Sequence, residues 1–145
     1  MSVLARPLIL VHGLWDTPKV FNRLILRCSQ SDKRILSPFL EHRSGLTSLR
    51  TLAKQLDFII TEEFGSNEKI DLLGFSMGGL ISRIWLQEMH GYLRTKRFFT
   101  IGSPHNGTLM ASLIPFTFAG GIADMKINSP LLNDLNADYR CLNNL

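Results

Sequence analysis

Four short apolar runs along the chain predict buried β-strands. They cover Pro7 to Gly13, Arg34 to Leu40, Lys69 to Phe75 and Arg97 to Ser103. Within them apolar residues follow one another instead of alternating with polar ones, which is typical of strands covered on both faces of a sheet. Each run is short and holds or ends near a glycine or proline, which favours a strand over a buried helix.

Between these runs, apolar residues recur at helical spacing in three longer segments. The first, Thr17 to Cys28, starts with a threonine that can cap the helix and has a proline at the first helical position. The second, Ser48 to Gly65, has a strong amphipathic pattern and stops at a glycine. The third, Gly78 to Gly91, follows the third strand. From Pro104 onward the pattern predicts loops, with one short helix near Pro130 to Leu135.

The order of these elements predicts an α/β fold in one domain, residues 1–145. Strands and helices that alternate along the chain favour a parallel sheet with helices on both faces. Ligands of such sheets bind at the carboxyl ends of the strands. Those ends are His12-Gly13, Pro38, Gly74 to Ser76 and Ser103 to His105, so we expect the functional site there.

Composition and charge exclude several functions. The net charge is +4, but no basic stripe carries interleaved aromatic residues, so we expect no nucleic-acid partner. Cys28 and Cys141 build neither a disulfide framework nor a zinc site, and Cys28 should pack on the apolar side of the first helix. We predict no transmembrane segment, and Leu8 to Val11 is too short a run for a signal sequence, so we expect a cytoplasmic protein.

The stretch "GFSMGG" between the third strand and the third helix predicts a nucleophile. Ser76 lies in a G-x-S-x-G pattern, and a strand, tight turn and helix in that order expose such a serine hydroxyl. Gly74 and Gly78 remove side chains that would collide with neighbouring elements in the turn. Taken alone the pattern is weak, and the alternative is a glycine-rich turn that only lets the strand and helix pack closely.

The first strand ends in "HGLWD", which predicts the second half of an oxyanion hole. Acyl transfer needs two backbone N–H donors for the oxyanion. Met77, directly after the serine, can supply one, and Leu14 can supply the other, with Trp15 as the second choice. His12 precedes this turn, and we interpret it as a structural hydrogen-bonding residue.

Three stretches together resemble the lipase and esterase group of α/β-hydrolases: "LILVHG", "LLGFSMGGLISR" and "IGSPHNGT". The resemblance covers the core of the first 110 residues. It implies a serine hydrolase that cleaves carboxylic (acyl) esters through an acyl-enzyme on Ser76, with no metal and no organic cofactor. It also implies that Arg83 is a structural ion-pairing residue and that His105 holds a turn.

The partners of Ser76 are harder to find. Glu88 and His90 lie at the far end of the helix that Ser76 starts, about 18 Å away for Glu88, and Asp71 lies roughly 16 Å back along a strand. His105 remains the one candidate base, and Asp124, Asp134 or Asp138 could orient it. The alternative is that the chain is C-terminally incomplete, because the resembling enzymes carry their acid and base on later strands.

Two further expectations follow. The apolar segment 109–123, with Phe116, Phe118, Gly120 and Gly121, predicts a lid or an acyl-binding cover, or a segment that packs on the sheet. An incomplete sheet of about four strands would expose an edge and favour self-association. Besides an esterase acting on an acyl ester or lipid, the sequence thus allows a catalytically inactive acyl-ligand binding module or a complementing fragment.

Overall fold

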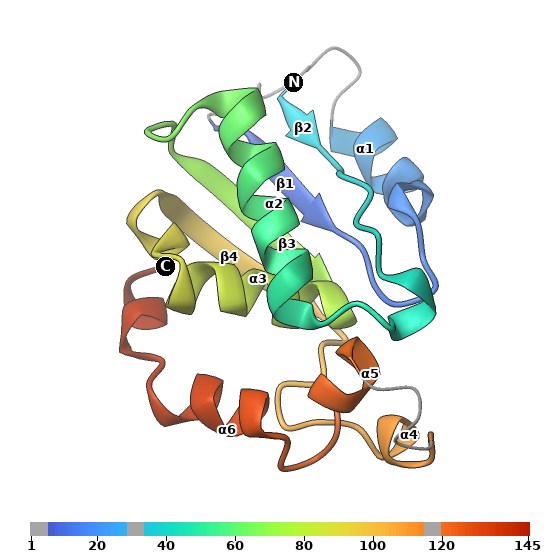
Figure 1. Ribbon diagram of the computed structural model, residues 1–145. Helices are drawn as coiled ribbons and strands as arrows, with labels where there is room; N and C mark the ends of the chain where they lie inside the picture. The colour runs from blue at the N-terminus through green and yellow to red at the C-terminus, as the bar shows by residue number, and fades with distance from the viewer. Residues whose placement is uncertain (1–5, 29–33, 115–119) are drawn as a thin grey trace.

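The protein is seen here as a computed structural model, which describes residues 6–28, 34–114 and 120–145 (Figure 1). Its centre is a parallel four-stranded sheet in the order β2-β1-β3-β4. The strands are β1 (Leu8–Val11), β2 (Ile35–Leu36), β3 (Ile70–Phe75) and β4 (Thr95–Ile101). The α/β prediction is confirmed, although β2 is much shorter than the run from Arg34 to Leu40, which Pro38 interrupts.

The predicted helices form, and a side chain caps each of the first two, although only the cap at Thr17 was predicted. The Thr17 side chain accepts a hydrogen bond from the Lys19 N–H, and Pro18 takes the first helical position. The Ser48 side chain accepts a hydrogen bond from the Thr51 N–H. The elements before β4 are η1 (Pro18–Phe21), α1 (Asn22–Cys28), η2 (Arg43–Gly45), α2 (Leu49–Phe64), α3 (Met77–Glu88) and η3 (Gly91–Leu93). After β4 come α4 (Leu109–Ser112), α5 (Gly121–Asp124), α6 (Pro130–Ala137) and η5 (Arg140–Asn144).

One face of the sheet carries the main core. Helices α2 and α3 cross in front of it in Figure 1; they pack on each other, and α3 packs on β1, β3 and β4. Ile9 and Leu72, which are register partners, point into this layer, where Leu56 and Leu80 are also fully buried. The indole of Trp85 joins the two helices by donating a 2.7 Å hydrogen bond to Asp57. The connection from β1 through α1 to β2 runs along the sheet in the opposite direction to the connections through α2 and α3. Because right-handed crossovers of opposite direction place their helices on opposite faces, α1 belongs to the other face of the sheet.

The other face is only partly covered, which corrects the prediction that all four strands are buried on both sides. Leu10 is buried there, but its neighbours in register become more exposed toward β4. Phe99 and Ile101 on β4 are 53% and 52% exposed. Within the described residues β4 pairs only with β3, so its outer edge is open. An apolar run alone could not reveal this, because it does not say how many helices cover each face.

A charged cluster closes the amino end of this second face. The Asp71 carboxylate is only 5% exposed and accepts hydrogen bonds from Arg6 at 3.2 Å and Arg97 at 2.5 Å. Burial would raise the pKa of this carboxyl, but the hydrogen bonds from Arg97 and Arg6 outweigh it and lower the pKa below its usual value. Two arginines thus allow a carboxylate to lie among apolar strands.

The segment after Pro104 is more helical than predicted. Of its helices only α6 was expected, because α4 and α5 are single turns without a readable period. Helix α6 lies beside α3, and α4 and α5 lie beyond the carboxyl ends of the strands (Figure 1). Of the predicted lid, residues 115–119, including Phe116 and Phe118, lie outside the described residues.

Two smaller findings complete the comparison with the sequence. Cys28 is exposed, so the expectation that it packs on the apolar side is wrong; α1 is a short helix without a single buried residue. Among the described residues no helix combines the length and the apolar character that a membrane crossing requires.

Replacing Asp71 by asparagine should lower the free energy of unfolding at pH 7 by about 1–3 kcal/mol, since the buried charge-assisted hydrogen bonds are lost. The folded pKa lies below 3.8, so this contribution is present at neutral pH and disappears as the pH falls below that value. Urea unfolding at pH 7 and pH 3 measures both effects. The control is Asp134→Asn, which removes an exposed partner of Arg50 and should cost under about 1 kcal/mol. Equal losses for the two variants would contradict the role given to Asp71.

Candidate active site

Ser76 occupies a strained turn between β3 and α3. Its backbone has φ 52° and ψ −124°, a region that costs a non-glycine residue about 1–3 kcal/mol. The Ser76 N–H donates a 2.8 Å hydrogen bond to the Ile101 carbonyl of β4, which fixes the turn against the neighbouring strand. The side chain does not cap the helix that follows. The serine therefore projects from the turn at the carboxyl end of the sheet.

The two glycines of the elbow are required by close backbone contacts. A Cβ atom on Gly78 would lie 2.1 Å from the Val11 carbonyl oxygen of β1. On Gly74 it would lie 2.4 Å from the Cα atom of Gly79. No side-chain movement relieves a clash with backbone atoms, so only glycine lets α3 begin this close to β1 and β3.

The turn after β1 lies directly beside Ser76. A Cβ atom built on Gly13 would be 3.0 Å from the Ser76 Cβ atom. The Leu14 and Met77 N–H groups, the two expected oxyanion donors, donate no hydrogen bond to any other described residue. For Met77 this is the usual state of the first turn of a helix, whose dipole also favours negative charge. Trp15, next to Leu14, has a positive φ of 60°.

His12 holds this turn from beneath. The ring is fully buried, and its Nε2 accepts a 3.1 Å hydrogen bond from the Leu40 N–H. Its Nδ1 therefore carries the proton and donates to the Gly13 carbonyl at 3.0 Å. Burial lowers the pKa of His12, and the neutral ring fits both hydrogen bonds. This geometry agrees with a structural hydrogen-bonding residue.

His105 lies in a different hydrogen-bond network. Its Nε2 is 3.1 Å from the Thr100 hydroxyl and its Nδ1 is 3.4 Å from the Arg83 guanidinium. Asn136 of α6 donates to the His105 carbonyl and accepts from Arg83. Burial and the charge of Arg83 lower the pKa of His105. Both ring nitrogens thus have partners, one on β4 and one on α3, and the His105 carbonyl is held by α6.

The three acids weighed as partners of His105 lie elsewhere. Asp124 accepts a 2.8 Å hydrogen bond from the Leu49 N–H at the start of α2, Asp134 pairs with Arg50, and Asp138 pairs with Arg140. The described residues therefore bring together Ser76, Leu14 and Met77, but give His105 none of these acids as a partner.

Arg83 corrects another expectation. It makes no ion pair with a described residue and instead donates to the Leu135 carbonyl, the Asn136 side chain and Gln87. Neutral oxygens from α6 satisfy a guanidinium that is nearly buried. The residue is structural, as the resemblance implied, but through hydrogen bonds.

An acidic residue that the sequence analysis did not weigh also lies at this turn. Asp16 Oδ2 is 3.3 Å from the point where a Gly13 Cβ would stand, and the Ser76 Cβ atom is 3.0 Å from the same point. Its position three residues after Gly13 in "HGLWD" was the signal available in the sequence. The Asp16 carboxylate and the Ser76 side chain thus both lie next to Gly13. The His42 Nε2 atom lies 3.4 Å from the Asp16 carbonyl oxygen.

A cavity of about 420 Å³ opens at Ser76. Its other walls come from the turn after β1, the loop after β4, and the α4 and α5 region, and they bear no charged side chain. The lining residues are Leu14, Trp15, Ser76, Gly102, Pro104, Thr108, Met110, Ala111, Leu113, Ile114, Ile122 and Met125. Its size and apolar walls suit a hydrocarbon chain with its reactive end at the serine.

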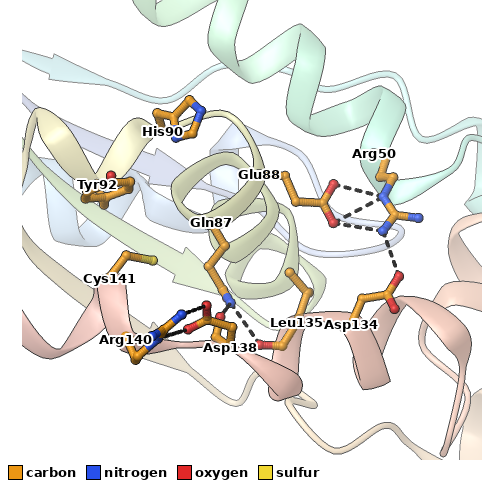
Figure 2. A pocket seen from close by; sticks show the side chains of 10 residues that line it. All are labelled: Arg50, Gln87, Glu88, His90, Tyr92, Asp134, Leu135, Asp138, Arg140 and Cys141. Atoms are coloured by element: carbon orange, nitrogen blue, oxygen red, sulfur yellow. Dashed lines mark hydrogen bonds and ion pairs between the residues drawn. The ribbon is translucent and has the colours of Figure 1, made fainter.

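A larger cavity, of about 690 Å³, lies near the carboxyl end of α3 between α2, α6 and η5 (Figure 2). Figure 2 shows that its charged side chains pair with one another: Arg50 binds Glu88 and Asp134, and Arg140 binds Asp138. Its larger volume would favour this cavity as the active site. However, no serine in a strained turn lines it, and its arginine and carboxylate side chains are paired with one another. We therefore place the candidate active site at the smaller, apolar one. The described residues contain no cluster of metal-ligating side chains.

The pKa of His12 is lower in the folded chain than its usual value of 6.5. At a pH just below 6.5 the unfolded chain therefore binds a proton at His12 more readily than the folded chain does. The free energy of unfolding should therefore fall as the pH drops through that window, and His12→Gln should make the fall smaller. His105, whose pKa is also lowered, supplies the part that remains. Chemical unfolding at several pH values between about 5 and 8 tests this, with His90→Gln at an exposed site as the control. An unchanged slope in His12→Gln would overturn it.

Solved structures support the fold. A phospholipase, PlaB from Legionella pneumophila, matches 95% of this chain and 35% of its own with a TM-score of 0.73 and 16% identity. The Bacillus licheniformis lipase BlEst2 in mature form matches 94% of this chain and 62% of its own, with a TM-score of 0.69 and 20% identity. Identities this low show a shared fold, that of the α/β-hydrolase lipases and esterases.

Sequence relatives identify the family. The lysosomal thioesterase PPT2 of Mus musculus is 27% identical over 106 residues, and that of Homo sapiens is 26% identical over the same length. These matches cover 70% of this chain and 35% of each relative, so the matched region is about a third of the relatives' length. The family model for palmitoyl protein thioesterase matches residues 7–136, which is most of the chain. The chain therefore belongs to the palmitoyl protein thioesterase family, within the α/β-hydrolase superfamily.

Proposed function

We propose that Ser76 is the nucleophile of an acyl hydrolase that cleaves long-chain thioesters or oxygen esters. The single observation that carries this proposal is the strained serine at φ 52°, which lines an uncharged, apolar cavity. Family membership supports an acyl substrate, and the names of the thioesterase relatives favour a thioester over an oxygen ester.

The proposed mechanism follows from the turn geometry. Ser76 Oγ attacks the acyl carbonyl carbon, and the carbonyl oxygen becomes an oxyanion. The Leu14 and Met77 N–H groups, which have no acceptor among the described residues, would stabilise that charge together with the positive end of α3. The thiol or alcohol leaves, and water then hydrolyses the acyl-enzyme while the acyl chain occupies the apolar cavity.

The proton of Ser76 needs a base. Both ring nitrogens of His12 and of His105 have other partners, so neither of these two histidines is a ready base. We propose that the acid and base come from polypeptide outside the 145 residues considered, as the short match to the relatives allows. On its own the chain would then hydrolyse acyl esters slowly, because loss of a triad member costs on the order of 10⁴–10⁶ in rate.

The apolar cavity, together with the engaged ring nitrogens of His12 and His105, favours a second candidate function. A chain with a formed acyl cavity and no engaged base could act as an acyl-ligand binding module or as a complementing fragment. Retention of a fluorescent fatty acid without hydrolysis would favour this second reading over slow turnover.

Ser76→Ala should abolish labelling by a fluorophosphonate probe and remove any hydrolysis of a long-chain acyl thioester. The probe is read by mass spectrometry, which also locates the modified residue. The matched control is Ser66→Ala, which changes an exposed serine beyond the end of α2. If Ser76→Ala labels and hydrolyses as the wild type does, the nucleophile lies elsewhere.

We also propose self-association through the open side of β4. Phe99 and Ile101 are about half exposed there, beside an unpaired strand edge, which proteins normally cover or charge. Phe99→Lys should shift sedimentation equilibrium toward the monomer at a concentration where the wild type is dimeric. Phe58→Lys on α2, with a similarly exposed phenylalanine, is the control. A monomeric wild type at all accessible concentrations would contradict the proposal.

A further inference from the structure

The mouth of the acyl cavity is surrounded by unusually exposed apolar side chains. We call Trp15, Leu109, Met110 and Leu113 the apolar rim; they are 66%, 72%, 70% and 79% exposed. Single exposed apolar residues are normal on a protein surface, but these four gather around one opening, and three of them also line the cavity. The rim lies beyond the carboxyl ends of the strands, where Figure 1 places α4.

The rim is held outward by ordered contacts. Ala111, in the middle of α4, is buried, while its neighbours Leu109 and Met110 face solvent. Thr108 caps this short helix by accepting from the Met110 N–H, and the Thr108 N–H donates a 2.9 Å hydrogen bond to the Met125 carbonyl. These contacts anchor α4 beside α5 with its apolar side chains pointing away from the core.

The rim and the cavity lining carry no charged side chain. Contact with such a surface must therefore come from burial of apolar area and not from ion pairing. A tryptophan at the edge of the patch suits the boundary between water and lipid, where its ring can be buried with the N–H still solvated.

We propose that the apolar rim inserts into the surface of a phospholipid layer and so places the cavity mouth against the acyl chains. The inference rests on the proposed function, since continuity between rim, cavity and Ser76 matters only if an acyl group is the ligand. An acyl chain could then pass from the lipid to Ser76 along uncharged walls without crossing water.

The test uses the Ser76→Ala protein and vesicles of phosphatidylcholine, so that binding is measured without hydrolysis. Trp85 is 1% exposed, and emission changes on binding therefore report on Trp15. We expect co-sedimentation with the vesicles, a blue shift of the tryptophan emission and quenching by brominated acyl chains. Binding should change little between about 0.05 and 0.5 M NaCl, since no charge is involved.

Leu109→Asp should lower the vesicle partition coefficient by about tenfold or more. Leu109 does not line the cavity, so hydrolysis or probe labelling with a short, soluble acyl substrate should be unchanged in this variant. The matched control is Leu93→Asp in η3, a similarly exposed leucine at the opposite end of β4, which should bind vesicles as the parent protein does.

Three results with vesicles would overturn the proposal: a parent protein that stays in the supernatant, an equal loss of binding in Leu93→Asp and Leu109→Asp, or binding that requires anionic lipid and disappears in salt. A dimer that Leu109→Asp dissociates in the absence of vesicles would also overturn it, by making a second copy the occupant. If the Ser76→Ala protein binds vesicles but the wild-type protein never reacts with the fluorophosphonate probe, the membrane role of the rim is upheld and the proposed hydrolase activity is rejected.

Discussion

The close approach of α3 to β1 is the constraint on which the rest of the site depends. The helix begins so near the first strand that a single methyl group on Gly78 would lie 2.1 Å from the Val11 carbonyl oxygen. This approach forces the chain through a sharp turn at residue 76 and places the free N–H groups of the first helical turn beside the turn after β1. The positions of Ser76 and of the Met77 N–H group therefore follow from one backbone contact.

The second half of the site is positioned by a separate set of contacts. His12 joins the turn after β1 to the backbone at Leu40. Beyond it, a Cβ on Gly45 would touch Ile122 and come within 3.3 Å of the Leu14 side chain. The turn after β1 is thus packed against η2 and α5, two elements that come from distant parts of the sequence. Because α5 also supplies Asp124 to cap α2, the wall of the cavity is part of the core and not an independent flap.

The sequence was sufficient where local rules decide the structure. Short patterns were enough to predict strands β1, β3 and β4, the cap at Thr17, and the glycines of the elbow. What it could not supply were contacts set by tertiary packing: the exposure of Cys28, the neutral partners of Arg83, the position of the Asp16 carboxylate next to Gly13, and the single turns α4 and α5. The open face of β4 belongs to this second group, since apolar runs do not state how many helices cover them.

Ser76 itself gives the clearest sign that the site is more than a packing device. Glycine would adopt φ 52° without strain, whereas serine costs the fold about 1–3 kcal/mol there. The side chain does not recover this cost, because it neither caps α3 nor donates to a described residue. A turn needed only for close packing would be more stable with glycine at this position. Ser76 is thus held in an unfavourable backbone conformation in the wall of an apolar cavity, near two N–H groups that have no acceptor among the described residues. Close packing alone does not explain that combination, whereas acyl-transfer chemistry would.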